Sequence, residues 1–531
     1  MRRIARRTFL RLAGGTTVVV AASASSKTAT PAEISEPNIE LRAWTAKGQP
    51  LPVGLLKQLY FLDLNDEPMP NPSRQVVAGK LFSQPPRQSF AIAAKIPVTG
   101  FGSVMLYADN QGKGYSAKDF PLDLNLAFAE SRLHRVRTAV SAWQRAGTRF
   151  SAQLEERLRQ AEASVKEAQT TQAIAAKAKL CNEALRQGLW AGEEAIFAKS
   201  QQDIRRHPLR PDFLFGCNFF GHPGNGAEYD RLFKRLFNFA TVPFYWQAFE
   251  PQPGQPNFAP VDERVNWLRQ ANITPKGHPL VWFHEVGIPN WLRNKSYTDV
   301  KQLTYQRICQ ISTHYGSKIP YYDIINEANG ISWANEFHYS QDQFLELTQL
   351  ASQAAASGNP QVKRIINNFG LWGEYVARAP VQAGQPGKLT QSPYRYLQRC
   401  IAANIPFEIA GFQLYYPNQD MFEINRQLDR YSKLGKPIHI TELGVSSATT
   451  RDEKSYLKAP EGLWHAPWSE KVQADWVEQF YTLCYSKPYI QAITWWDFAD
   501  RGNFWPHGGL LQADMTPKEA YHRLANLMKE W

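Results

Sequence analysis

The sequence predicts an α/β fold, a (β/α)8 TIM barrel over residues 209–531, preceded by a small β-sandwich-like module and a helical segment. Three observations favour the barrel. Eight short runs rich in β-branched and aromatic residues follow one another, amphipathic helical stretches separate them, and polar residues gather where the runs end. The runs cover residues 213–220, 237–244, 274–282, 321–327, 362–369, 407–416, 437–445 and 490–498.

A doubly wound sheet is the competing α/β arrangement, and it needs a glycine-rich phosphate-binding turn after its first strand. The residues there read GCNFFGHPGNG, which matches that turn poorly. The helical stretches between the runs, such as VDERVNWLRQA and DQFLELTQLASQAAA, suit the barrel. We therefore expect a closed barrel.

Two regions precede the barrel. Residues 38–125 contain the strand-like stretches IELRAW, KQLYFLDL, QSFAIAAKIPV and GSVMLYADN, separated by turn residues, which predicts a β-rich accessory module. This module is either a sugar-binding module or a plain packing domain. Residues 126–208 are rich in Ala, Glu, Gln, Lys and Arg at helical spacing and predict a helical hairpin or stalk.

The first 24 residues have the features of an export signal. Five arginines and no acidic residue precede the apolar stretch Thr16–Ala22, and Ala22-Ser23-Ala24 offers a small-residue cleavage site. Arg6-Arg7-Thr8-Phe9-Leu10 resembles a bacterial twin-arginine signal, which predicts a periplasmic or extracellular protein. A disordered basic tail or a membrane anchor is the alternative. Residues 25–37 form a polar linker.

Charge and cysteine content exclude some classes of protein. The formal net charge of +12 falls by five to +7 once the arginines of the signal are removed, and most of that excess lies in the helical segment. The barrel is nearly neutral, so a nucleic-acid groove along it is not expected. The five cysteines are scattered with no CxxC pair, so neither a disulfide framework nor a metal site is indicated.

Two glutamates end predicted strands where a barrel places its chemistry. Glu327 follows the run YYDIIN, and Glu442 ends the run PIHIT. A buried unpaired carboxylate is costly, so a glutamate at such a position is either solvated or there for chemistry. Cleavage of a glycosidic bond needs two carboxylates. The other strand-end residues are His278, Trp282, Asn326, Gln413, Tyr415 and Trp496.

Each of these residues also has a purely structural interpretation. A single strand-end glutamate is often solvated or paired with a cation, but two of them on one face favour catalysis. His278 could be a histidine satisfied within the core, and Trp496 and Trp505 could simply cap the barrel. Their position beside Asp497 and Asp500 slightly favours a sugar platform.

The ordered segments KGHPLVWFHEVGIPNWL, YYDIINEA, IPFEIAGFQ, PIHITELGV and FWPHGGLLQADMTPKEAYHRL resemble those of glycoside hydrolase family 10, a family of endo-β-1,4-xylanases. The resemblance covers about residues 213–531. It implies that Glu327 is the general acid/base and Glu442 the nucleophile. It further implies sugar contacts from these side chains: Trp246, His278, Trp282, Asn326, Gln413, Tyr415, Trp496 and Trp505.

The chain departs from that family in its sugar pocket. The family's second strand carries Asn, Glu and Lys, where this chain has Val242, Pro243 and Tyr245. The family's histidine after the sixth strand is Tyr415, and the aspartate after the nucleophile is Gly444. A tyrosine is longer than a histidine and a glycine leaves room for it. We therefore expect the Tyr415 hydroxyl to hydrogen-bond Glu442.

Together these features predict an exported, retaining endo-β-glycosidase acting on β-1,4-linked xylan or a related plant β-glycan. We expect no cofactor, no metal, no nucleic-acid partner and no stable membrane insertion after removal of the signal. One rival keeps the chemistry but uses a different β-linked glycan, or transfers the sugar to an acceptor. The other rival is a barrel that binds glycan without cleaving it.

Overall fold

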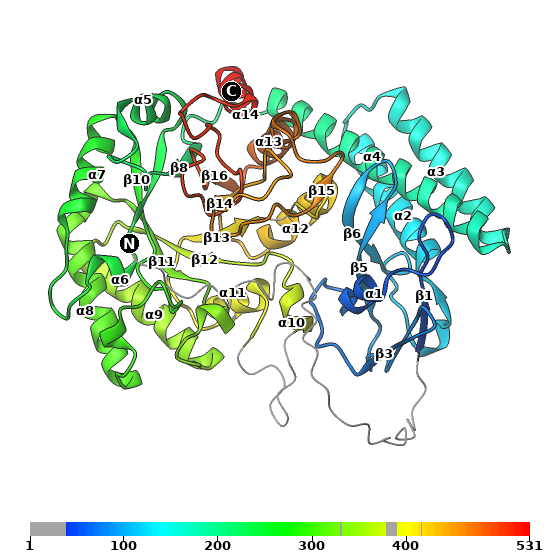
Figure 1. The fold of residues 1–531 in the computed structure, drawn as a ribbon, viewed down its shortest axis with the longest axis horizontal. Coiled ribbons are helices and arrows are strands. Elements are labelled where there is room, and N and C mark those ends of the chain that lie inside the picture. Colours follow the sequence, from blue (N-terminus) through cyan, green and yellow to red (C-terminus); the bar gives the residue numbers. More distant parts are fainter. Residues whose placement is uncertain (1–38, 330–331, 379–389, 416) are drawn as a thin grey trace.

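The computed structural model describes residues 39–329, 332–378, 390–415 and 417–531. The predicted signal (1–24) and linker (25–37) lie outside the described residues. In Figure 1 the barrel occupies one side of the molecule, and the N-terminal strands and long helices α2–α4 occupy the other. Within the described residues, no helix is long and apolar enough to cross a membrane.

Eight parallel strands close the barrel in the order β10-β11-β12-β13-β14-β16-β8-β9. Each strand lies within one of the eight predicted runs, so the predicted fold class is confirmed. The strands are β8 (Leu214–Asn218), β9 (Phe239–Pro243), β10 (Thr274–His278), β11 (Tyr321–Asn326), β12 (Lys363–Asn368), β13 (Ile409–Leu414), β14 (Ile438–Leu443) and β16 (Ile490–Trp495).

Amphipathic helices surround the strands and bury their apolar faces against them, as the periodicity predicts. Several begin at a side-chain cap. Ser296 and Ser340 form capping boxes at α8 and α9, and Asp420 caps α12. The helices are α5 (Gly226–Leu236), α7 (Ala259–Gln270), α8 (Tyr297–Tyr315), α9 (Gln341–Gly358), α11 (Pro393–Ala402), α12 (Met421–Ser432), α13 (Glu470–Tyr485) and α14 (Glu519–Glu530), with short α6 (Trp246–Phe249) and α10 (Glu374–Arg378) in loops.

The N-terminal module consists of two four-stranded sheets that share one apolar core. One sheet has the order β3-β4-β1-β7, and the other has the order β15-β6-β5-β2. The predicted strands are present, but the sequence analysis missed β3, β4, β7 and β15. The strands are β1 (Ile39–Arg42), β2 (Tyr60–Leu62), β3 (Arg74–Val77), β4 (Lys80–Ser83), β5 (Ala91–Val98), β6 (Gly102–Ala108), β7 (Leu122–Asp123) and β15 (Leu463–Trp464), and the short helix α1 spans Val53–Gln58.

The helical segment differs from the predicted hairpin because it contains three helices. They are α2 (Leu124–Arg145), α3 (Ala152–Thr170) and α4 (Ile174–Arg206). Asp123 caps the first, and Gly147, with φ of 90°, lies just after its end. The buried face of α2 includes the polar residues Ser131 and Arg132, which interrupt its apolar spacing. Because of that interruption, apolar spacing alone did not predict α2 as a separate helix.

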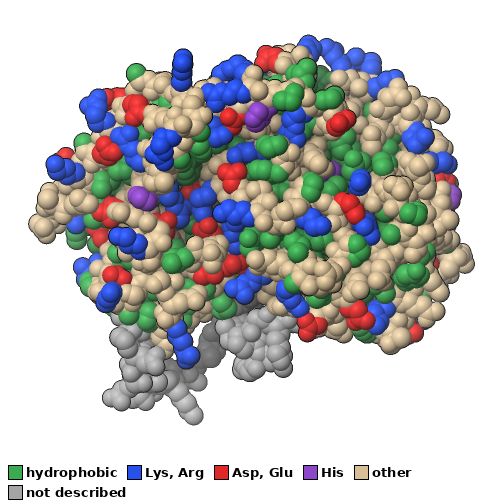
Figure 2. Space-filling view, turned by 180° about the vertical axis from the view of Figure 1, so that it is seen from behind, with side chains coloured by type: hydrophobic (Ala, Val, Ile, Leu, Met, Phe, Trp, Pro, Cys, Tyr) green, Lys and Arg blue, Asp and Glu red, His purple; other side chains and the backbone are tan. Residues whose placement is uncertain are grey.

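The surface and the thiols agree with the sequence analysis. Figure 2 shows Lys/Arg and Asp/Glu side chains interspersed over the described part of one face. The five cysteines are free thiols, and four of them are buried. Burial raises the pKa of the Cys181 thiol to about 12, so this thiol is protonated and unreactive.

Candidate active site

Glu327 stands at the end of β11 with its backbone in the left-handed region, at φ of 55°. Its backbone N–H donates to the carbonyl of Asn367 at 2.9 Å, so the turn is tied to the neighbouring strand. A residue other than glycine adopts such a conformation only where the surroundings enforce it, commonly at functional sites. The turn takes Glu327 out of the strand alternation, and its side chain is only 6% exposed.

Three N–H donors hold the Glu327 carboxylate. The amide of Gln413 donates to Oε1 at 2.9 Å. The indole N–H groups of Trp282 and Trp333 donate to Oε2 at 3.1 and 3.2 Å. Both oxygens are therefore oriented by groups on β13, the loop after β10 and the loop after β11.

Glu442 lies within β14, opposite Gln413 in the register of β13 and β14. The side-chain amide of Asn367 donates to its Oε1 at 3.0 Å, and the Tyr415 hydroxyl donates to its Oε2 at 3.3 Å. The expected hydrogen bond from Tyr415 to Glu442 is therefore present. A Cβ at Gly444 would lie 3.3 Å from Cε1 of Tyr415, so the glycine does leave room for the tyrosine ring.

Asn367, at the end of β12, connects the two predicted strand ends. Its amide also donates to Oδ1 of Asn326 at 2.8 Å, and its own Oδ1 accepts a hydrogen bond from Thr441 at 2.5 Å. The sequence analysis did not select this residue. A signal was present, because the fifth predicted run ends in the polar pair Asn367-Asn368 as the fourth ends in Asn326-Glu327.

A buried charge cluster lies beneath the carboxylates. Lys276 forms an ion pair of 2.7 Å with Asp323, and neither side chain is exposed to solvent. Asp323 also accepts a 2.7 Å hydrogen bond from Nδ1 of His278, which fixes the tautomer and the ring orientation. Nε2 of His278 therefore faces Glu442, 3.8 Å from Oε1. Burial lowers the pKa of His278 despite its carboxylate partner, so the ring is neutral.

Burial raises the pKa values of both glutamates, and the neighbouring charge adds to the effect at Glu442. Burial, and after it the charge of Glu327, raises the pKa of Glu442 to about 8. Burial raises the pKa of Glu327 above its ordinary value, although the surrounding N–H donors oppose this. Two neighbouring buried carboxylates titrate as a pair. Both shifts favour retention of a proton in the pair, as acid-assisted cleavage requires.

Both carboxylates line one cleft of about 620 Å³ at the C-terminal ends of the strands. Five of the predicted sugar contacts line this cleft too: His278, Trp282, Asn326, Gln413 and Trp496. The sequence analysis missed several aromatic lining residues that come from loops: Phe220, Trp333, Phe369, Tyr456 and Phe504. Tyr245, one of the departures from the family, lines the cleft as well.

Three predicted sugar contacts lie elsewhere. Trp246 is buried away from the cleft, where its indole donates to Glu250 at 2.8 Å and packs on Trp291. Trp505 is buried behind Tyr415, with the two rings stacked at 5.6 Å. These residues support the wall of the site because β9 and the loop after β16 turn them inward. Tyr415 acts on Glu442 through its hydroxyl and does not line the cleft.

The described residues contain no group of three or more His, Cys, Asp or Glu side chains that could hold a metal ion. The cleft instead offers carboxylates, amides, indoles and one neutral imidazole. These are groups suited to proton transfer and to hydrogen bonding and stacking with sugar rings.

Three known proteins are similar to this chain in sequence or structure. "Endo-1,4-beta-xylanase B" of Thermotoga neapolitana is 23% identical over 332 residues, which cover 60% of this chain and 88% of that protein. "Beta-1,4-xylanase" of Dictyoglomus thermophilum is 24% identical over 316 residues, which cover 56% and 84%. Native xylanase 10B from Thermotoga maritima aligns in structure with a TM-score of 0.48 at 20% identity, over 60% of this chain and 95% of that one.

The family described as "Glycosyl hydrolase family 10" matches residues 210–527, which is more than half of the chain and spans the whole barrel. The match leaves out residues 39–123 of the N-terminal module and all three helices that follow them. It also decides against the rival of a barrel that only binds glycan. The chain belongs to glycosyl hydrolase family 10 and is a glycoside hydrolase.

Proposed function

We propose that the protein is an exported, retaining endo-β-glycosidase that hydrolyses β-1,4-linked xylan or a related plant β-glycan. The observation that carries the proposal is the pair of buried carboxylates, Glu327 and Glu442, on one cleft at the strand ends. The names of the relatives support xylan as the substrate class.

In the first step the ionised Glu442 attacks the anomeric carbon and forms a covalent glycosyl-enzyme, while Glu327 gives its proton to the departing oxygen. The hydrogen bonds from Asn367 and Tyr415 stabilise the charged form of Glu442 and fix its direction. The raised pKa values keep a proton in the carboxyl pair, and the reactive arrangement is the one in which Glu327 carries it and Glu442 is ionised.

In the second step Glu327, now ionised, takes a proton from water, and the resulting hydroxide attacks the anomeric carbon and releases Glu442. The Gln413 amide and the Trp282 and Trp333 indoles keep the Glu327 oxygens in place as its charge changes. Neither step needs a metal or an organic cofactor.

A different β-linked glycan remains a second candidate substrate because of the pocket beside Glu442. The positions that carry Asn, Glu and Lys in the family are Val242, Pro243 and Tyr245, so they offer few hydrogen-bonding groups to a sugar. The Tyr245 ring packs against His278 and Trp282 at centroid distances of 5.8 Å. This pocket favours a glycone with fewer polar contacts than xylose makes in the family.

Product analysis on a panel of β-glycans tests the proposal. Purified protein is incubated with xylan, mixed-linkage glucan, mannan and cellulose, and the products are sized by chromatography while NMR follows the anomeric signal. We expect internal cleavage of a xylan-type chain, with the β-anomer appearing first. A first product of α configuration would refute retention, and cleavage of only another glycan would move the substrate to that polymer. Products longer than the substrate would indicate transfer.

Export by the twin-arginine route is part of the proposal. It rests on Arg6-Arg7-Thr8-Phe9-Leu10 and the small residues at 22–24. Residues 1–37 fused to a folded reporter should carry it out of the cytoplasm, and replacement of Arg6 and Arg7 by lysine should stop this. Export that persists in the double-lysine variant would rule out this route.

A further inference from the structure

One segment of the barrel, residues 444–469 between β14 and α13, contacts both the N-terminal module and the catalytic cleft. This segment, the bridging loop, begins directly after Glu442 and contains the short strand β15. In Figure 1, β15 lies beside β6, between the barrel and the module. The family match begins at residue 210, so residues 39–123 of the module and all three helices lie outside what the family accounts for.

The module holds the bridging loop by strand pairing. β15 extends the sheet of β2, β5 and β6 as an antiparallel strand, with Leu463 opposite Ser103 and Trp464 opposite Gly102. The approach is close, because a Cβ at Gly102 would lie only 2.2 Å from the carbonyl oxygen of Leu463. Gly102 also has φ of 150°, which disfavours any other residue. A glycine is therefore required at the contact.

Helix α4 adds a second attachment through Glu193, a buried carboxylate that is 2% exposed. Its oxygens accept hydrogen bonds from the Trp464 indole at 2.9 Å, from the backbone N–H of Met421 at 3.0 Å and from His465 at 2.5 Å. Burial alone would raise the pKa of Glu193, but His465 and the hydrogen bonds lower it overall. A charged, fully used carboxylate thus joins α4, the bridging loop and α12.

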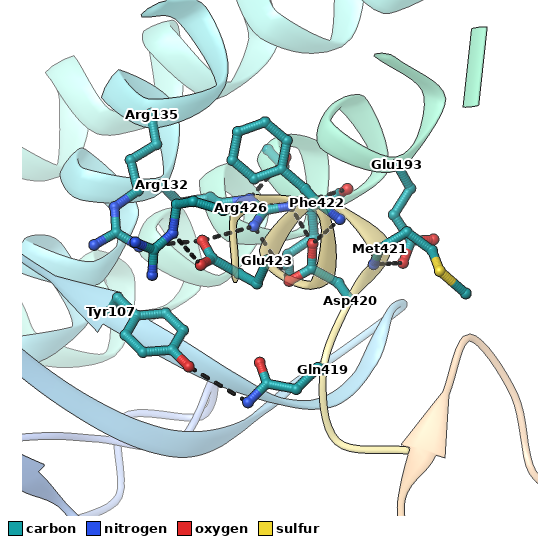
Figure 3. A network of polar contacts seen from close by, with 12 residues as sticks. Tyr107, Arg132, Arg135, Glu193, Gln419, Asp420, Met421, Phe422, Glu423 and Arg426 are labelled. Atoms are coloured by element: carbon teal, nitrogen blue, oxygen red, sulfur yellow. Dashed lines mark hydrogen bonds and ion pairs between the residues drawn. The ribbon is translucent and has the colours of Figure 1, made fainter. Parts of the chain in front are cut away.

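An ion-pair network next to Glu193 fixes the helices to which the loop is attached. Figure 3 shows Glu193 beside Met421 at the start of α12, with Arg132 of α2 reaching Asp420. The Arg132–Asp420 distance is 2.8 Å and both side chains are almost fully buried. Truncating one member of a buried, hydrogen-bonded pair is strongly destabilising. The attachment point therefore moves little relative to the barrel.

The other part of the bridging loop forms part of the cleft. Tyr456 lines the cleft, and its backbone N–H donates to the carbonyl of Asn503 at 2.7 Å. Leu457 donates to Phe504 at 3.1 Å and packs on the cluster of Tyr415, Trp496 and Trp505. The loop thus supplies one wall of the site and supports the aromatic residues behind Glu442.

We propose that the N-terminal module and α4 are a positioning device for the cleft, which sets the bridging loop through the β6–β15 pairing and Glu193. The device acts on the substrate through Tyr456 and Leu457. This goes beyond the proposed function, because it gives a role to the part of the chain that the family does not cover. Only the kinetic tests of this proposal depend on the proposed glycan hydrolysis; the hydrogen-exchange test does not.

The first test compares two glycine substitutions in the module of the full-length protein. Gly102→Ala puts a methyl group against Leu463, whereas Gly112→Ala, at φ of 84°, puts one where no atom lies within 4 Å. Both substitutions strain a left-handed glycine, so Gly112→Ala is the matched control. Hydrogen exchange followed by mass spectrometry should become faster in residues 444–469 for Gly102→Ala alone.

Kinetics test whether the loosened loop affects the cleft. Gly102→Ala and Glu193→Gln should raise KM for a long oligosaccharide about tenfold, because displacement of a positioning group by about 1 Å has effects of this order. A small, activated aryl glycoside does not reach the wall formed by the bridging loop. Its kcat should therefore stay within about twofold of the wild-type value. Glu193→Gln keeps the size of the side chain, so the test does not depend on Gly102→Ala folding.

A double-mutant cycle makes the test specific. Tyr456→Ala should itself raise KM for the oligosaccharide, and adding Glu193→Gln should raise it little further, since residues that act through one another are not additive. Additive effects of the two substitutions on KM, or equal losses of kcat on both substrates, would overturn the proposal. The module would then only stabilise the fold. Faster exchange of the loop with no turnover of any glycan would instead count against the proposed function.

Discussion

Glu327 and Glu442 have the same residue type and the same 6% exposure, yet their surroundings differ. Glu327 sits on a left-handed turn and receives N–H groups partly from loops, through Trp282 and Trp333. Glu442 sits inside a strand and receives hydrogen bonds from Asn367, near the end of β12, and from Tyr415, directly after β13. The proposed nucleophile is thus held from barrel strands, while the proposed proton carrier is held by one strand residue and two loop residues. Equal burial does not imply equal roles.

Truncating the two carboxylates should separate these roles with the largest effect. Glu442→Ala should lower kcat by about four orders of magnitude or more on every substrate, since no nucleophile remains. Glu327→Ala should lower it by about three orders of magnitude on xylan but only about tenfold on a dinitrophenyl glycoside, whose leaving group needs little protonation. Initial rates on both substrates provide the measurement.

Glu263→Ala is the matched control for both variants, because Glu263 is an exposed glutamate of α7 that does not line the cleft. It should change neither rate. Equal losses on both substrates for Glu327→Ala would mean that this residue does not protonate the leaving group. Retained turnover in Glu442→Ala would remove it from the nucleophile position.

Removing the Tyr415 hydroxyl should have the next largest effect. Tyr415→Phe should lower kcat about ten- to a hundredfold, the equivalent of one hydrogen bond to a charged group. The hydroxyl favours the ionised form of Glu442, so its loss should raise the pKa of Glu442 and move the acid side of the pH–rate profile to higher pH.

The pH profile distinguishes this role from a packing role, since a loosened fold would lower the rate without moving the profile. Tyr305→Phe is the control, because Tyr305 is 39% exposed on α8. An unchanged acid side in Tyr415→Phe would show that some other group holds the Glu442 carboxylate.

The fold and the carboxylate pair could be predicted from the sequence because both depend on local patterns. Each barrel strand lies within one of the eight predicted runs, and both glutamates follow apolar, β-branched stretches directly. The proximity of Tyr415 and Gly444 could be predicted because the small glycine leaves room for the long tyrosine side chain. The missed features depend on long-range contacts. β15 is two residues long and pairs with a strand far away in the sequence, and Tyr456 reaches the cleft from a long loop.

Two errors have the same origin. Trp246 was expected at the cleft because of the family resemblance, but the chain turns into α6 there, and the ring packs on Trp291 and under Arg307. The first helix of the hairpin region was missed because its buried Arg132 serves an ion pair with the barrel. Local spacing cannot reveal a partner hundreds of residues away.

Burial of the Glu442 carboxylate should make the stability of the folded protein depend on pH. Its folded pKa of about 8 lies above the ordinary value of 4.5, so between these values the folded state holds the proton more tightly than the unfolded state. Stability contributed by this group is therefore lost as pH rises through that window. Glu442→Gln, which cannot ionise, should raise Tm by about 2–4 °C at pH 8.5 and by less than about 1 °C at pH 5.

Differential scanning calorimetry at the two pH values gives the measurement. Glu263→Gln, at an exposed site, should change Tm equally and slightly at both. A rise in Tm for Glu442→Gln that is the same at pH 5 and pH 8.5 would mean that burial of this carboxylate does not disfavour its charge in the free enzyme.

The smallest effect should come from Gly444, which accommodates the Tyr415 ring. Gly444 has no left-handed φ, so alanine fits its backbone, and the added Cβ would lie 3.3 Å from Cε1 and 3.5 Å from Cδ1 of Tyr415. That contact is slightly too close, so the ring should shift by a few tenths of an ångström and lengthen its 3.3 Å hydrogen bond to Glu442. Gly444→Ala should therefore lower kcat by about two- to fivefold, and Gly444→Val by roughly as much as Tyr415→Phe, because the larger side chain displaces the ring. Gly54→Ala, where the new Cβ meets no atom within 4 Å, is the control and should have no effect.

The decisive measurement is the double variant. If Gly444 acts only through Tyr415, then Gly444→Ala should cost nothing further once the hydroxyl has been removed by Tyr415→Phe. Independent losses in the double variant would mean that Gly444 affects Glu442 by a route other than the tyrosine.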